Sequence, residues 1–306
     1  MRLRLGRPDI DRYADRFDVP RAQGAFGITF LGVSTLLVDD GDTAVLTDGF
    51  FSRPSLAKVA AGRIAPNQAR IDAAWGRVGV EGLEVVAPVH THFDHAMDSA
   101  VVAERAGAVL AGGASAANVG RGHGLADEQL LVVTPGEPVD VGAFRLTWIE
   151  SEHCPPDRYP GPITAPVVPP VRAGAYRCGE AWSILLEHRS GRRALIQGSA
   201  GFVRGSLAGE RAEVAYLGVG QLGLQSEDYL RTYWAETVET VGARHAVLIH
   251  WDDFFRPLDQ PLRALPYAGD DLDITMRTFA DLASAQGVTL HFPTLWQRED
   301  PWAIPG

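Results

Sequence analysis

The 306-residue chain is poor in lysine, in cysteine and in long apolar runs. Lys58 is its one lysine, and 38 acidic residues against 28 basic ones give a formal net charge of −10. A negative chain offers no basic face to nucleic acid or to an anionic membrane, so neither partner is expected. No apolar run reaches the length of a membrane span, and residues 1–19 lack the apolar core of a signal peptide. These absences predict a cytoplasmic protein.

Cysteine is represented only by Cys154 and Cys178. A disulfide between them is one interpretation, but the lack of an export signal favours free thiols. The composition otherwise supports a folded protein. Hydrophobic residues make up 46% of the chain, which is long enough to bury a full core.

The most informative segment is the run His90–His95, His-Thr-His-Phe-Asp-His, which places four metal-ligand side chains in six residues. It directly follows the apolar run 83–89, which is typical of a buried strand. In an extended chain His90 and His92 point to the same face, so their imidazoles can converge on one ion. The carboxylate and imidazole that end the segment can then face a second ion. The alternative, a solvated loop with three histidines by chance, is disfavoured because histidine is scarce here.

This segment resembles the HxHxDH signature of the metallo-β-lactamase superfamily. The resemblance implies a third histidine, a bridging aspartate and a late histidine, each at the carboxyl end of a strand. His153 follows the strand-like run 144–149 and fits the first of these positions. His250 closes the apolar run 246–249 and fits the last. At the place of the bridging aspartate the chain has Ser199.

The resemblance implies two neighbouring metal sites. The first is a set of three neutral nitrogens that leaves a coordination position open for water, as in catalytic zinc sites: His90, His92 and His153. The second combines a carboxylate with two imidazoles: Asp94, His95 and His250. The expected cofactor is Zn²⁺, one ion or two, with Mn²⁺ and Fe²⁺ as alternatives. Hydroxide formed at the metal would act as the nucleophile.

Ser199 is the departure from the family pattern. Its neutral hydroxyl is a poor ligand, so the bridging negative charge is missing and two ions repel each other more strongly. One outcome is a single metal at the three-histidine site, with Asp94 as the general base. A second is two metals bridged by hydroxide alone or by a replacement carboxylate, for which the candidates are Asp252, Asp253 and Glu152. A third is the loss of hydrolytic function. Ser199 itself remains a candidate ligand.

Residue patterns predict strands and helices along most of the chain. Strands are expected at 27–31, 35–38, 44–47, 83–89, 108–110, 130–133, 139–149, 181–188, 193–197, 212–217, 246–250 and 288–292, and helices at 96–106, 113–119, 226–241 and 274–286. Ligands at strand ends suit two sheets packed face to face under outer helices. The resemblance implies the same α/β fold, a four-layer αβ/βα sandwich of two mixed β-sheets with outer helices. We expect one domain, 1–306, with an N-terminal extension (1–24) and a C-terminal extension (256–306).

Residues 155–180, called the Pro-rich loop below, contain seven prolines, which exclude a helix or a central strand. Long loops without secondary structure are typically lids or binding loops. Because this one begins beside His153, we expect it to lie over the metal site as a wall or lid. Arg158 and Tyr159 are its candidate substrate-binding residues. A stiff surface crossing is the alternative.

A turn follows the third expected strand, at Asp48–Phe51. In the families that the chain resembles, an acidic residue near this place supports a histidine ligand. Asp48 is therefore a candidate carboxylate for orienting an imidazole. Phe50 and Phe51 are candidate substrate-binding residues as an apolar pocket wall, and the alternative is that they belong to the core.

The resemblance covers residues 27–255, and its layout is most like the lactonase-like and general metal-dependent hydrolase branch. It implies an enzyme, a zinc-dependent hydrolase of a small-molecule ester or lactone. The chain has no basic cluster for a phosphate group. Two alternatives stay open: a phosphodiesterase of the same superfamily, and a non-hydrolytic metal-binding protein such as a lyase, an isomerase or a binding module. The expected partner is a small-molecule substrate, and a homo-oligomer is also open.

Overall fold

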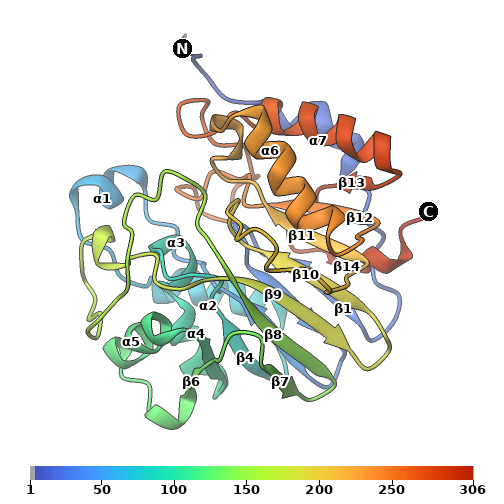
Figure 1. The fold of residues 1–306 in the computed structure, drawn as a ribbon. Coiled ribbons are helices and arrows are strands. Elements are labelled where there is room, and N and C mark those ends of the chain that lie inside the picture. The colour runs from blue at the N-terminus through green and yellow to red at the C-terminus, as the bar shows by residue number, and fades with distance from the viewer. Residues whose placement is uncertain (1–3, 306) are drawn as a thin grey trace.

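Two mixed β-sheets of seven strands each form the frame of the molecule (Figure 1). The computed structural model describes residues 4–305. In spatial order the first sheet contains β14 (Arg298–Glu299), β1 (Gly27–Phe30), β2 (Leu36–Asp39), β3 (Ala44–Thr47), β4 (Leu83–Ala87), β5 (Val109–Gly112) and β6 (Leu130–Val132). The second contains β13 (Thr289–His291), β12 (His245–Ile249), β11 (Val214–Gly218), β10 (Arg193–Gln197), β9 (Ala181–His188), β8 (Phe144–Ser151) and β7 (Pro138–Val141).

Helices cover the outer face of each sheet. In Figure 1, α2 (Gln68–Val78) and α4 (Ser99–Ala106) lie on the side of the first sheet, and α6 (Glu227–Trp234) and α7 (Leu272–Gln286) on the side of the second. The remaining helices are α1 (Leu56–Ala61), α3 (Phe93–Ala96) and α5 (Ala114–His123), with 3-10 turns η1 (Ile10–Arg16), η2 (Asp127–Gln129), η3 (Ala173–Ala175), η4 (Leu222–Leu224) and η6 (Pro301–Ala303) and the π-helical turn η5 (Ala235–Glu239).

The space between the two sheets is filled by apolar side chains from both. Val85 of β4, Trp148 of β8 and Tyr216 of β11 belong to one buried cluster that joins the sheets. A strand with one face in this space should alternate buried and more exposed side chains. β8 does so, since Phe144 and Trp148 are buried while Arg145 between them is exposed. The order of layers is helix, sheet, sheet, helix. The predicted α/β four-layer sandwich is therefore confirmed.

The strand predicted at 139–149 is a hairpin of two strands, β7 and β8. The chain turns at Gly142, whose φ of +57° suits glycine and whose missing Cβ leaves room for the side chain of Thr43. By contrast, β9 and β10 have the predicted bounds, 181–188 and 193–197. A turn that depends on one backbone angle is harder to read than an apolar run.

The predicted helices are shorter or interrupted in the structure. The helix expected at 96–106 is divided into α3 and α4, and Asp98 between them directs its carboxylate to the N–H groups of Phe51 and Ser52 at 2.8 and 2.6 Å. The helix expected at 226–241 continues after Trp234 as the π-helical turn η5. Helices α1 and α2 were not predicted.

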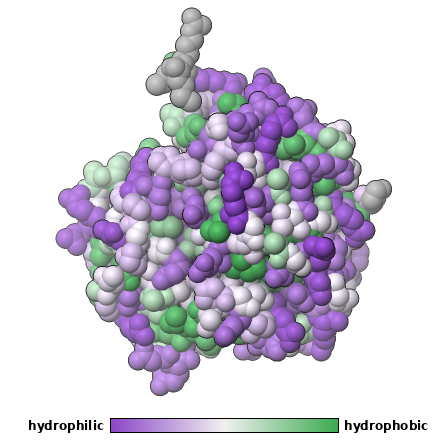
Figure 2. Space-filling model, in the orientation of Figure 1, coloured by the Kyte–Doolittle hydropathy of each residue, from purple (hydrophilic) through white to green (hydrophobic). Residues whose placement is uncertain are grey.

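The surface visible in Figure 2 is largely polar, with apolar residues scattered over it. Such isolated apolar residues are ordinary on a protein surface. Within residues 4–305, no helix combines the length and apolar character needed to cross a bilayer. The large apolar side chains that are exposed in the described chain are Leu5, Leu56, Val132 and Val168.

Glu299 of β14 is a buried acid, 1% exposed, whose Oε1 accepts hydrogen bonds from Thr294 N and Gln297 Nε2 at 3.0 and 3.1 Å. Burial raises its pKa from 4.5 to about 8. The protonated side chain therefore stabilises the folded state fully below pH 4.5, the pKa in the unfolded chain. This stabilisation is lost as the pH rises through about 8, the pKa in the folded protein. Glu299→Gln keeps the acceptor oxygen but cannot ionise. We expect its free energy of unfolding to decrease less than that of the wild type between pH 4.5 and about 8. Urea denaturation at a series of pH values measures it, and parallel curves for both proteins would contradict the expectation.

Candidate metal centre

Strand ends deliver the predicted ligands to one edge of the sandwich. β4 leads into the segment His90–His95, of which the last three residues already belong to α3. β8 ends shortly before His153, and β12 ends directly before His250. All of these residues are buried or nearly so, although they are polar. Buried polar groups that converge from separate strands require a partner.

The first cluster consists of His90, His92 and His153, whose ligand nitrogens lie within 4.8 Å of one another. His90 Nε2 and His92 Nδ1 are 3.1 Å apart. The three rings are steeply inclined to one another, at 77° to 86°. His153 Nδ1 donates to the carbonyl oxygen of Cys154 at 2.7 Å, so its Nε2 carries the free lone pair. Three inclined imidazoles around one point suit a tetrahedral ion with an open fourth position.

The second cluster consists of Asp94, His95 and His250. The Nε2 atoms of His250 and His95 are 3.2 Å apart, and Asp94 Oδ2 lies 3.6 and 3.8 Å from them, respectively. The two clusters adjoin, because the ring centroids of His90 and His95 are only 3.8 Å apart. The structure thus brings together all six side chains in the two sets that the resemblance implied. That they bind metal stays a prediction.

Asp48 lies behind His95, on the side away from the second cluster. Its Oδ2 is 2.9 Å from His95 Nδ1 and also accepts the hydroxyl of Ser34 at 2.6 Å. Its Oδ1 accepts the N–H of Val89 at 2.9 Å. With Nδ1 of His95 at this carboxylate, Nε2 of the ring faces the second cluster. The structure therefore brings Asp48 to the position expected of a supporting carboxylate.

Burial keeps four of the five imidazoles in their neutral form. It lowers the pKa of His153 to about 4, and with the nearby imidazoles it lowers that of His90 well below the ordinary value of 6.5. Burial is also the main cause of the lowered pKa of His92 and of His250. A neutral imidazole is the form that binds metal, so these residues need not lose a proton first at neutral pH.

Neighbouring charges oppose the effect of burial on the pKa of Asp94 and on that of His95. Burial alone would raise the pKa of Asp94, but the imidazoles of His95 and His250 lower it. Burial alone would lower the pKa of His95, but the carboxylates of Asp48 and Asp94 raise it. Asp94 is therefore ionised at neutral pH and can either bind a cation or accept a proton.

The backbone around the second cluster is strained. Four of the non-glycine residues with positive φ in the described chain gather here, among them Val33 at +54° and His250 at +58°. A β-branched residue rarely adopts this conformation. Val33 N–H donates to Asp252 Oδ1 at 2.9 Å, and Val33 O accepts the N–H of His250 at 2.7 Å. Such strain persists where the surrounding structure enforces it, which is common at functional sites. The other two residues are Asp48 and Arg53.

Ser199 is 7% exposed and follows β10. Its hydroxyl accepts the N–H of Cys154 at 3.0 Å, which ties this segment to the residue after His153. Of the replacement carboxylates, Asp252 pairs with Arg53 instead, at 2.7 Å. Asp253 likewise pairs with two arginines. In the described part of the chain, neither they nor Glu152 join a group of converging ligands.

The candidate substrate-binding residues differ in their placement. Phe50 and Phe51 are 0% and 4% exposed and belong to apolar clusters, which favours the alternative that both are core residues. Arg158 is exposed. Tyr159 lies nearer the site, with its ring centroid 6.4 Å from that of His92. A substrate-binding role of any of the four stays a prediction.

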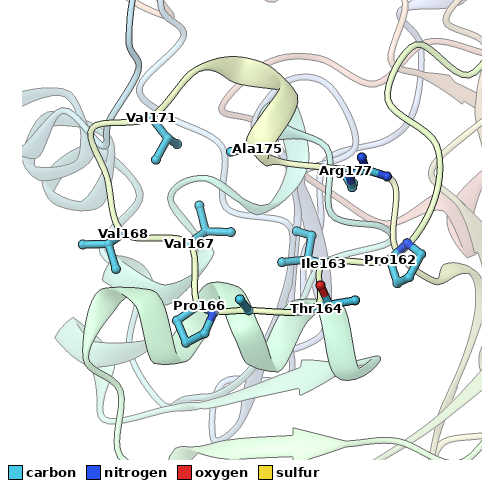
Figure 3. A pocket seen from close by; sticks show the side chains of 10 residues that line it. Pro162, Ile163, Thr164, Pro166, Val167, Val168, Val171, Ala175 and Arg177 are labelled. Carbon is cyan, nitrogen blue, oxygen red and sulfur yellow. The ribbon is translucent and has the colours of Figure 1, made fainter.

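The Pro-rich loop folds over α5 and lines an open hollow of about 260 Å³ (Figure 3). Figure 3 shows apolar side chains of the loop, Ile163, Val167 and Val171 among them, gathered around it. Asn118 of α5 holds the loop by two hydrogen bonds. Its side-chain Nδ2 donates to Ile163 O at 2.7 Å, and its backbone carbonyl oxygen accepts the N–H of Val167 at 3.2 Å. The lining of this hollow includes none of the six predicted ligands.

Both cysteines are free thiols in the structure, as the sequence predicted.

Two contacts beside the site were missed by the sequence analysis. Asp157 Oδ1 lies 3.2 Å from His92 Nε2, and these residues form a third group of converging ligand atoms with Cys178. Ser34 binds both Asp48 and His95 from a turn that has no recognisable motif. The one signal for Asp157 was its place in a loop that begins beside a predicted ligand.

The donor set fits a divalent cation. His95 Nε2, His250 Nε2 and Asp94 Oδ2 lie 3.2 to 3.8 Å from one another, so three donor atoms converge on one point. His250 Nδ1 and His90 Nδ1 are buried and, among residues 4–305, have no hydrogen-bond partner. Nitrogen and oxygen donors of this kind suit zinc and its neighbours in the first transition row.

No protein-family model and no curated protein matches the sequence. Solved structures match the fold. A metallo hydrolase from the hyperthermophilic archaeon Ignicoccus hospitalis is 12% identical, with 89% of this chain and 96% of that chain covered and a TM-score of 0.51. A candidate metal-dependent hydrolase from Parabacteroides distasonis is 11% identical, with 91% and 99% covered and a TM-score of 0.53. CmlA, a diiron β-hydroxylase from Streptomyces venezuelae, is 11% identical, with 90% and 54% covered and a TM-score of 0.54. At such identities the likeness is one of fold.

Proposed function

We propose that this chain, which has the metallo-β-lactamase fold, is a metal-dependent hydrolase of a small-molecule ester or lactone. The observation that carries the proposal is the pair of adjoining ligand clusters at the edge of the sandwich. Two of the structures that share the fold are named as a metallo hydrolase and a candidate metal-dependent hydrolase, which supports the same reaction class. The fold alone does not imply the reaction, so the clusters carry the argument.

Zn²⁺ is the proposed cofactor, with one ion at each cluster. Five imidazoles and one carboxylate make a donor set that zinc favours, and Mn²⁺ and Fe²⁺ accept the same donors. Bound there, such an ion lowers the pKa of a coordinated water to about 7 and polarises an oxygen of the substrate.

The residues of the chain divide the remaining work between them. His90, His92 and His153 are held neutral by burial and are ready to bind without losing protons. Asp94 stays ionised because His95 and His250 lower its pKa. It can therefore take part in the second site or, with a single ion bound, accept the proton of the attacking water.

Ser199 gives the two sites unequal affinities. Its hydroxyl already accepts the N–H of Cys154, and no carboxylate in the described chain spans the two clusters. Without a bridging negative charge the two cations repel each other more strongly. We therefore expect the second ion to bind more weakly than the first.

An oxidative iron enzyme is the second candidate. It is favoured by the likeness to CmlA, which has the same fold and is named as a diiron β-hydroxylase. The same histidines and carboxylate can hold iron as well as zinc. Oxygen consumption by the iron-loaded protein would distinguish this activity from hydrolysis.

The test begins with the metal content of protein purified without added metal or chelator, measured by plasma mass spectrometry. We expect about two equivalents of metal per chain, and zinc-dependent turnover of aryl esters or lactones that a chelator stops. One equivalent would restrict binding to the three-histidine cluster and leave Asp94 as the base. No binding even after zinc is supplied would contradict the proposal. Turnover of a phosphodiester alone would assign the protein to the phosphodiesterase alternative.

A further inference from the structure

The Pro-rich loop is fastened to the histidine segment. Thr91, which separates the two histidines at the start of the signature, donates its N–H to Cys178 O at 2.8 Å and its hydroxyl to Arg177 O at 2.6 Å. The beginning and the end of the loop are joined as well, because Cys178 N–H donates to Tyr159 O at 2.8 Å. The start of the loop is therefore held at a fixed place beside the first cluster.

Asp157 occupies this place. Its Oδ1 accepts the N–H of Tyr159 at 2.9 Å, an Asx-turn that sets the direction of the carboxylate. The same oxygen lies 3.2 Å from His92 Nε2. His92 is 6% exposed, and its Nε2 has no hydrogen bond of good geometry with any residue of the described chain. The distance between the two atoms is within the range of an N–H···O hydrogen bond.

The arrangement has the same form as that of Asp48 and His95. There the carboxylate lies at Nδ1 and leaves Nε2 to the second cluster. Asp157 lies at Nε2 of His92 and leaves Nδ1, which is 3.1 Å from His90 Nε2, to the first cluster. A neutral imidazole carries one N–H, so an acceptor at one ring nitrogen leaves the lone pair on the other.

We propose that Asp157 is a positioning residue for His92, whose carboxylate keeps the ring N–H on Nε2 and so presents Nδ1 to the ion of the three-histidine cluster. This inference rests on the metal-dependent function proposed above. Asp157 also places a negative charge beside the first cluster, in a protein whose Ser199 supplies none. The Pro-rich loop thereby becomes part of the metal centre, because a shift of the loop would move Asp157 away from His92.

A separate cation site formed by His92, Asp157 and Cys178 explains the same contacts less well. It would use Nε2 of His92 and the thiolate of Cys178 as ligands. Burial and the neighbouring Asp157 raise the pKa of the Cys178 thiol, which disfavours the thiolate that such a site needs.

The experiment measures zinc affinity by competition with a chromogenic chelator, using variants that keep the loop intact. Asp157→Asn retains an acceptor for the Asx-turn but removes the charge, and we expect it to weaken binding at the first site about 10- to 100-fold. Asp157→Glu should restore part of the loss. Glu180→Gln is the matched control, because this carboxylate in the same loop accepts Ser115 N–H at 3.1 Å and belongs to no ligand group in the described chain.

A second measurement reports on His92 directly. Imidazole ¹⁵N chemical shifts in the zinc-loaded protein should show the Nε2–H form of His92 in the wild type. The electronic spectrum of the Co²⁺-loaded protein should change in Asp157→Asn and not in Glu180→Gln. Unchanged zinc affinity in Asp157→Asn, or an Nδ1–H form in the wild type, would overturn the inference. Both readouts concern metal binding, so a protein that shows them but hydrolyses nothing would refute the proposed function and keep the role of Asp157.

Discussion

Replacing His92 by alanine should remove about one equivalent of metal per chain and lower kcat/KM for ester or lactone hydrolysis by more than about 100-fold. Mutation of a residue that only hydrogen-bonds to a metal ligand lowers metal affinity or activity by about 10- to 100-fold, and loss of the ligand itself lowers them further. His92 Nδ1 is 3.1 Å from His90 Nε2 and within 4.8 Å of the ligand nitrogen of His153, so its loss leaves two donors. Metal analysis and steady-state kinetics measure the two effects.

His188→Ala is the matched control for this substitution. His188 pairs with Phe144 in the β8–β9 ladder, whereas Ser151, close to His153, lies at the other end of β8. This variant should keep its metal and its turnover. If His92→Ala also kept both, the three-histidine cluster would not be the metal centre and the proposed function would fail with it.

Arg53→Met should lower the free energy of unfolding by about 3–5 kcal/mol, the usual cost of breaking a buried ion pair. Arg53 Nη2 lies 2.7 Å from Asp252 Oδ2, and both side chains are fully buried. The substitution leaves a buried carboxylate whose remaining hydrogen-bond donor in the described chain is Val33 N–H. Because Val33 O also holds the N–H of His250, metal binding at the second cluster should weaken too. Urea denaturation and metal analysis measure these effects.

The ion pair of Arg145 with Asp140 provides the comparison. Its atoms are also 2.7 Å apart, but the side chains are 53% and 67% exposed. Arg145→Met should change the free energy of unfolding by less than about 1 kcal/mol. The double variant Arg53→Met/Asp252→Leu removes both buried charges and should recover part of the loss. An Arg53→Met protein as stable as Arg145→Met would show that burial adds nothing to the pair.

The sequence predicted the bounds of a strand best where the residues of that strand alone were enough to identify it. β9 and β10 have their predicted bounds because buried strands are apolar runs, which can be recognised without their neighbours. The hairpin at Gly142 was missed, since a single positive φ decided it. Helices α1 and α2 were missed as well, and the first of these has no buried residue to mark a face.

The candidate site shows the same division. Local spacing was enough to put His90 and His92 on one face and Asp94 and His95 beyond them. Adding His153 and His250 required the resemblance to a family, because no local pattern joins three distant strand ends. The structure supplies that proximity through the order of its sheets.

By itself, then, the sequence determined the ligand-bearing segment, the strands that carry the other candidates and the absence of a carboxylate at Ser199. Only the tertiary structure decided where each acid lies: Asp48 beside His95, Asp157 beside His92, and Asp252 beside Arg53 rather than in a ligand cluster. The reason is physical. Ligand types and periodicities are properties of short stretches of chain, whereas a hydrogen bond or ion pair depends on a few tenths of an ångström, set by the packing of distant segments.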